Sequence, residues 1–256
     1  SVYFGGINAN GGVINLDALA GNVAVNSAII VSNGALNLGG GIRNLDVDGA
    51  VQIDGNLTAS ANAAVGSGDV NIAATGTVPF VMNSSAVVVK GDVDVTDDAD
   101  VRNVQLDSSL VSVEGNVDVA NKGYLTLGAS GNSAVVNVGQ SVNVSNSGTL
   151  ENFANNFTAG TIGGNGLIIT HGENITANAG DIDIAGGLVV DSARADLPTT
   201  GLITRDTNTV NITTTAAGAD IRFVTVDVAS GNTLKFDAAD ALNIAGTIVN
   251  SGNLMA

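Results

Sequence analysis

The sequence predicts an all-β fold, a single-chain parallel β-solenoid (β-helix) with about 24 residues per coil and about ten coils. Three observations predict it. Apolar residues recur at every second position in short bursts that end at Gly, Asn, Asp or Ser. Similar strands return at a nearly constant spacing. Hydrophobic residues make up 45% of the 256 residues but aromatic ones only 3%, with 34 Gly, which favours a thin aliphatic core.

The strands are predicted, in order along the chain, from pairs or triplets of aliphatic residues separated by single polar ones. Many follow the unit Gly-(Asn/Asp)-aliphatic-x-aliphatic, as in residues 21–25, 68–72 and 180–184. Turn lengths vary, whereas the strands do not. The clearest examples are Val23/Val25, Leu36/Leu38, Val51/Ile53, Val70/Ile72, Ile182/Ile184, Val210/Ile212 and Val224/Val226/Val228.

The middle of the chain carries the repeat most clearly. Segments 85–101, 108–127 and 133–153 align in five apolar columns that step by 24 and then 25 residues. In a solenoid, side chains in one column lie roughly 4.8 Å apart and stack into inward ladders. An antiparallel sandwich or barrel is the alternative, but it needs no similarity at a fixed period. The columns are Val87/Val111/Val136, Val89/Val113/Val138, Val93/Val117/Val142, Val95/Val119/Val144 and Val101/Leu125/Leu150.

The chain is expected to form one domain, 1–256, because the strand and turn pattern continues to the last residues. One stretch breaks it. Residues 191–208 hold Pro198 and two of the eight basic residues, Arg194 and Arg205. We expect this stretch to be a loop or a widened turn that leaves the stack.

Charge and composition exclude several classes of partner and site. With 8 basic and 24 acidic residues the net charge is -16, which disfavours nucleic acid and anionic membranes as partners. The absence of cysteine excludes disulfides, zinc thiolate sites and thiol nucleophiles. No apolar run is long enough for membrane insertion. The chain begins with Ser1 rather than Met, so a processed or excised form is expected.

An acidic run in the middle of the chain is a candidate calcium site. Five carboxylates fall within nine residues, and dense oxygen ligands of this kind suit calcium. Asp118 would stack one coil above Asp94, and a cation would relieve their repulsion. The alternative is a solvated outward face, because the Gly-Gly-x-Gly-x-Asp series of calcium-binding repeats is missing. The candidate ligands are Asp92, Asp94, Asp97, Asp98 and Asp100; no other cofactor is expected.

His171, the sole histidine, and the pair Asp97-Asp98 raise the question of an enzyme. Pectin-cleaving hydrolases on β-helices combine an Asp pair, a His and a downstream Arg-x-Lys, but no Arg-x-Lys follows His171 here. An enzyme would need Asp97, Asp98 and His171 to converge. We therefore expect no enzymatic activity and interpret His171 as a surface turn residue.

Asn and Thr motifs are interpreted as products of composition. Thr213-Thr214-Thr215 is interpreted as a local cluster without threonine partners one coil away, so a threonine face of the ice-binding kind is not expected. Asn-x-Ser/Thr triplets, which arise by chance in so Asn- and Thr-rich a chain, begin at Asn56, Asn83, Asn143, Asn156, Asn174 and Asn211.

The Gly-(Asn/Asp)-aliphatic-x-aliphatic units, the Asn-Ser-Gly-x-Leu turns at 146–150 and 250–254 and the lack of cysteine resemble bacterial surface β-helix proteins. These are the autotransporter passengers and the filamentous-haemagglutinin-like adhesins, including surface-layer-like passengers. The resemblance implies a non-enzymatic structural protein, extracellular or on the bacterial cell surface. It would contribute to adhesion, to display or to a surface coat, with a host or cell-surface ligand.

The two ends of a solenoid leave strand edges unpaired unless a polar cap covers them. No amphipathic helix is predicted at either end of this sequence. One consequence is self-association, in which copies stack end to end into a filament. If the chain is a piece of a longer one, neighbouring coils would cover the same edges instead.

Overall fold

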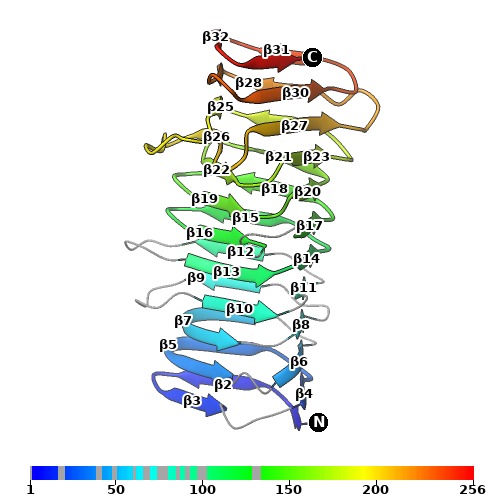
Figure 1. The fold of residues 1–256 in the computed structure, drawn as a ribbon. Helices are drawn as coiled ribbons and strands as arrows, with labels where there is room; N and C mark the ends of the chain where they lie inside the picture. The colour runs from blue at the N-terminus through cyan, green and yellow to red at the C-terminus, as the bar shows by residue number, and fades with distance from the viewer. Residues whose placement is uncertain are drawn as a thin grey trace.

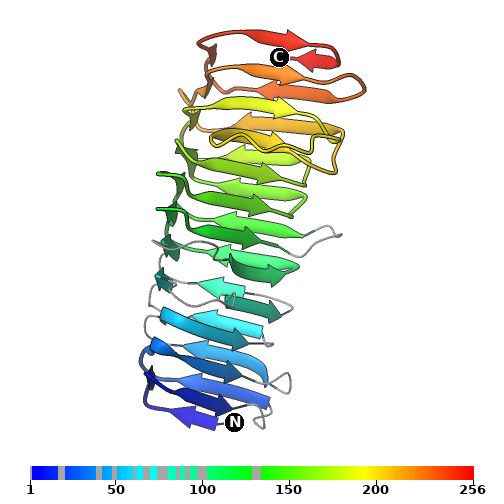
Figure 2. The same cartoon turned by 90° about the vertical axis from the view of Figure 1, so that its left-hand side faces the viewer.

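A computed structural model confirms the predicted fold class. Parallel strands stack along one axis, with the two termini at opposite ends of the stack (Figures 1 and 2). The described part of the chain contains strands and turns but no helix. The structure describes residues 2–16, 21–38, 42–47, 51–59, 62–65, 70–73, 80–84, 87–89, 93–96, 103–128 and 134–256.

One face of the solenoid is a twelve-stranded sheet with one strand per coil, here called sheet A. Its strands between residues 21 and 177 follow the right side of Figure 1. The twelve strands agree only roughly with the predicted ten coils. They are β1 (Val2–Phe4), β4 (Gly21–Val25), β6 (Ile42–Val47), β8 (Asn62–Val65), β11 (Val87–Val89), β14 (Leu110–Val113), β17 (Val135–Val138), β20 (Asn156–Ala159), β23 (Asn174–Ala177), β27 (Thr209–Thr214), β30 (Thr233–Asp237) and β33 (Asn253–Met255).

The other strands form two further rows, called row B1 and row B2, and the long strands β5 and β7 belong to both. Row B1 contains β2 (Ile7–Asn10), β5 (Ile29–Leu38), β7 (Val51–Ala59), β9 (Val70–Ala73), β12 (Val93–Thr96), β15 (Val117–Ala120), β18 (Ser141–Val144), β21 (Thr161–Gly164), β24 (Ile182–Ile184), β28 (Ile221–Phe223) and β31 (Leu242–Ile244). Row B2 contains β3 (Val13–Leu16), β5, β7, β10 (Phe80–Ser84), β13 (Asn103–Ser108), β16 (Tyr124–Leu127), β19 (Thr149–Asn152), β22 (Leu167–Thr170), β26 (Gly201–Thr204), β25 (Gly187–Val190), β29 (Val226–Val228) and β32 (Ile248–Asn250).

The strand register confirms four of the five predicted columns. Val87 pairs with Val111, which pairs with Val136, and the other three valine columns pair in the same way. The fifth column is wrong at its first member, because Val104 rather than Val101 pairs with Leu125. The lengths of both strands and turns vary from coil to coil, so a constant period misplaces that residue.

The main core consists of inward ladders of mostly aliphatic side chains from sheet A and from rows B1 and B2. Val111, Val117 and Leu125 have no solvent exposure, and their partners in the next coil, Val136, Val142 and Leu150, are at most 1% exposed. Alternation places every second side chain of strands such as β15 inside, whereas β22 and β26 are buried at every position. β-branched residues fit such a pleated, buried surface. Val224 departs from the prediction: it is 42% exposed, because it lies at the corner between β28 and β29 rather than within a strand.

A repeated tight corner explains the Asn-Ser-Gly turn. Asn146 and Ser147 both have positive φ, at 47° and 66°, and Gly148 follows them. One coil earlier Asn121 and Lys122 take the same conformation, at 51° and 66°. Asn tolerates this left-handed region better than most residues. A Cβ on Gly148 would collide with the backbone oxygen of Val119, so this corner requires glycine.

Within the expected loop 191–208, residues 201–204 form strand β26, and that strand lies out of sequence order. It pairs with β22 on one side and with β25 on the other, so the chain returns beneath the strand it has just left. Gly201 has φ 117° where it pairs with Gly187, a conformation and an approach that favour glycine. Residues 191–200 form no strand and project from the stack beside β26, in yellow in Figure 1.

Candidate functional site

The acidic run predicted to bind calcium falls almost entirely outside the described residues. This holds for Asp92, Asp97, Asp98 and Asp100. Asp94 lies in β12 and pairs with Asp118, as the sequence predicted. In the next coil Asn143 donates a hydrogen bond to Asp118 (Nδ2 to Oδ1, 3.1 Å), so an amide rather than a third carboxylate continues the column. Calcium binding therefore stays a prediction; in the described part of the chain no cluster of three His, Cys, Asp or Glu side chains is arranged to hold a metal.

His171 is the centre of a polar cluster rather than an exposed turn residue. Its side chain is only 11% exposed. Nε2 lies 2.8 Å from Glu151 Oε1, and Nδ1 lies 2.8 Å from Asp206 Oδ2. The ring stacks on Phe153, with centroids 4.1 Å apart and planes 11° apart. His171 does follow β22 in a turn, but the interpretation of its side chain as a surface group was wrong, because the levels of the stack on both sides supply partners for it.

Tyr124 extends this cluster on the other side of Glu151. Its hydroxyl donates to Glu151 Oε2 at 2.5 Å. The hydrogen bond from His171 is the main cause that lowers the pKa of Glu151, with a further contribution from Tyr124, against the opposing effect of burial. Burial, reinforced by the bond to Glu151, raises the pKa of Tyr124 well above its usual value. Glu151 is therefore held ionised and Tyr124 neutral.

Strand register positions the members of the cluster. The last residues of three row B2 strands pair in one buried column: Asn152, Thr170 and Thr204. Asn152 Nδ2 donates to Thr170 Oγ1 at 3.2 Å. The residues that follow them, Phe153 and His171, consequently stack on each other. Asp206 comes from the turn after the inserted strand β26. The cluster thereby ties that insertion to the coil below it.

The polar groups of this cluster bond one another and hold neighbouring coils together. Both ring nitrogens of His171 and both oxygens of Glu151 are engaged by protein groups. Polar networks in which every member is satisfied rigidify a structure. The sequence signal for the pair Phe153 and His171 is the alignment of residues 151–153 with 169–171, at a step of 18 residues. A search at a constant 24-residue period misses this alignment.

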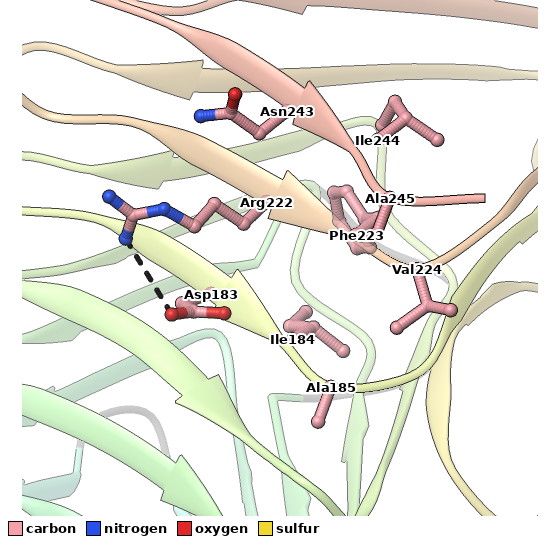
Figure 3. Close-up of a pocket in the computed structure, with 9 residues that line it drawn as sticks. All are labelled: Asp183, Ile184, Ala185, Arg222, Phe223, Val224, Asn243, Ile244 and Ala245. Carbon is pink, nitrogen blue, oxygen red and sulfur yellow. Dashed lines mark ion pairs between the residues drawn. The ribbon is translucent and has the colours of Figure 1, made fainter.

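A second ionic network lies on the outer side of row B1. Arg222 bonds Asp181 and Asp220, each at 2.6 Å, and lies 3.6 Å from Asp183. The backbone N–H of Asp220 and the Arg222 guanidinium lower the pKa of Asp181. A shallow hollow of about 340 Å³ adjoins this network (Figure 3). Asp183, Arg222 and Asn243 form its polar side, and Ala185, Val224 and Ala245 its apolar side.

The outer surface of sheet A carries a regular Asn-x-Thr pattern, which we call the Asn/Thr strip. Thr213 pairs with Thr176, which pairs with Thr158, so the expectation that Thr213 lacks a threonine partner one coil away was wrong. The adjacent column consists of asparagines whose side chains bond one another. The strip comprises Asn156 and Thr158 on β20, Asn174 and Thr176 on β23, and Asn211 and Thr213 on β27.

No helix in the described residues is long and apolar enough to cross a membrane. Comparison with protein-family models, with curated proteins and with solved structures finds no match for this chain.

Proposed function

We propose that this chain is a non-enzymatic structural and adhesive β-solenoid of a bacterial surface, which contributes to adhesion or to a surface coat. The observation that carries the proposal is how its polar groups are used. The acid and base groups around His171 and Arg222 bond one another, whereas the Asn/Thr strip turns a regular polar lattice outward. Such a molecule offers contact surface rather than a reaction centre.

The composition supports an extracellular setting. A cysteine-free, acidic chain rich in Asn, Gly and Thr suits that environment, and its net charge of -16 favours solubility over binding to anionic surfaces. The resemblance to autotransporter passengers and filamentous-haemagglutinin-like adhesins points in the same direction. Host or cell-surface molecules are then the expected ligands.

Two measurements test this function. Antibodies raised against the chain are expected to label intact cells of the source bacterium; labelling only after permeabilisation contradicts a surface location. Beads coated with the purified chain are expected to adhere to cultured host cells in larger numbers than beads coated with an unrelated protein of similar negative charge. Equal numbers on both kinds of bead contradict adhesion.

A second candidate function is self-assembly by end-to-end stacking, and the last coil favours it. Ile248, Val249 and Met255 are 50%, 51% and 44% exposed there, and at the opposite end Tyr3 is 71% and Val13 69% exposed. Exposed strand edges with apolar side chains can pair with another chain. Sedimentation of the 256-residue chain is expected to reveal concentration-dependent oligomers that Val249→Lys weakens. A monomer at all concentrations would exclude stacking of this chain.

A further inference from the structure

The outward positions of sheet A are uncharged over five successive strands, from β14 to β27. None of these eleven side chains is ionisable, although the chain carries 24 acidic residues. Charge returns only on β30, at Lys235 and Asp237. The eleven residues are Leu110, Ser112, Val135, Asn137, Asn156, Thr158, Asn174, Thr176, Thr209, Asn211 and Thr213.

The amides of the Asn/Thr strip are held in place before any ligand arrives. Asn174 Nδ2 donates to Asn156 Oδ1 at 2.9 Å, and Asn211 Nδ2 donates to Asn174 Oδ1 at 2.9 Å. Each such bond uses one of the two amide hydrogens of its donor and one of the lone pairs of its acceptor. The remaining donors and acceptors recur at the spacing of the coils, and a ligand that uses them loses little side-chain entropy.

We propose that the Asn/Thr strip binds a neutral polysaccharide that lies along the solenoid axis. Sugar hydroxyls both donate and accept hydrogen bonds, as do the amides and hydroxyls of the strip. An anionic polymer would instead approach a chain with a net charge of -16. The inference rests on the adhesive function proposed above and names the class of ligand and the face that binds it.

The size and chemistry of the strip disfavour a protein partner. The uncharged outward face of sheet A that contains the strip is about four residues wide and five strands long, which is roughly 10 Å by 20 Å and a few hundred Å². Stable protein complexes need about 800 Å² per partner and centre on aromatic or arginine side chains. The eleven outward positions contain neither. A linear polymer about one strand wide fits the strip without those anchors.

Retention on insoluble cellulose and chitin, and affinity electrophoresis in dextran, test the proposal with the purified 256-residue chain. The chain is expected to be retained by at least one of these neutral polymers. Thr176→Arg places a long side chain at the centre of the strip and is expected to weaken binding about tenfold. Thr225→Arg makes the same change at an exposed corner between β28 and β29, off the strip, and is expected to leave binding unchanged.

Circular dichroism and thermal melting establish that both variants fold, and Thr158→Arg replaces Thr176→Arg if the latter does not. Retention on none of the neutral polymers, retention on alginate alone, or equal weakening by both variants overturns the proposal. A dimer that Thr176→Arg dissociates would mean that a second copy covers the strip, which also overturns it. Coated beads distinguish the adhesive function from the proposed binding face. If beads coated with the wild-type chain and with Thr176→Arg adhere to cells equally, the adhesive function stands and the strip is not the site of adhesion.

Discussion

At the scale of single residues, His171 is the most informative side chain because it has partners from two other coils. Its replacement by alanine removes two hydrogen bonds and the Phe153 stack, and leaves the largely buried Glu151 carboxylate with fewer partners. We expect His171→Ala to lower the free energy of unfolding by about 1–3 kcal/mol. Asp206→Ala breaks only the outer contact, whose carboxylate is 78% exposed, and is expected to cost at most about 1 kcal/mol. Urea denaturation measures the free energy of unfolding of both variants. Equal losses would contradict the role of His171 in holding the neighbouring coils together.

Tyr124 provides a second prediction, in its alkaline titration. Because burial and Glu151 raise its pKa, the folded protein favours the neutral phenol. The stability that this supplies is complete below the ordinary tyrosine pKa of about 10 and is lost as the pH rises above it. The chain has two tyrosines and no tryptophan, so Tyr3→Phe leaves Tyr124 as the only phenol. Its ultraviolet titration is expected to lie above that of the unfolded chain, and Glu151→Gln is expected to lower it. Superimposable folded and unfolded curves would refute this.

At the scale of elements, the strands were predictable and some of their partners were not. Alternation and the Gly-(Asn/Asp) units locate strands such as β15 and β18, because each strand must bury every second side chain locally. The register of Val104 and the order β22, β26, β25 depend on turn length and on contacts between distant residues. The repeat period of the sequence, measured over three coils, predicts neither this register nor this strand order. The His171 cluster escaped sequence analysis for the same reason.

The inserted strand leads to the third prediction. Ile203 on β26 is 1% exposed and packs against Leu167 and Ile169 in a small cluster separate from the main core. We expect Ile203→Ala to cost about 2–4 kcal/mol, as for other truncations of buried aliphatic side chains. Leu197→Ala, in the same excursion but at a residue 44% exposed, is expected to cost less than about 1 kcal/mol. If the two substitutions destabilise the chain equally in urea, β26 is not part of the stack.

At the scale of the whole molecule, the strands that the structure describes pair only with strands of the levels directly above and below them. Strand β23 pairs with β20 and β27, and the same nearest-neighbour pattern recurs along sheet A. The stability of such a protein is approximately a sum of coil terms and interface terms. A substitution that destabilises one coil is therefore expected to destabilise its neighbours as well, and to have less effect on more distant coils. In a globular core the effect would not be limited in this way.

Ile175→Ala tests this, because Ile175 lies on β23 with no solvent exposure and pairs with Phe157 and Ile212. The cavity is expected to weaken amide protection in β20, β23 and β27, because those strands lose packing with the side chain. Strand β14, three strands away from β23 in sheet A, is expected to keep its wild-type exchange rates. Hydrogen exchange followed by mass spectrometry measures both regions in one experiment. A uniform loss of protection from β1 to β33 would mean that the solenoid opens as one cooperative unit, and the nearest-neighbour account would then be wrong.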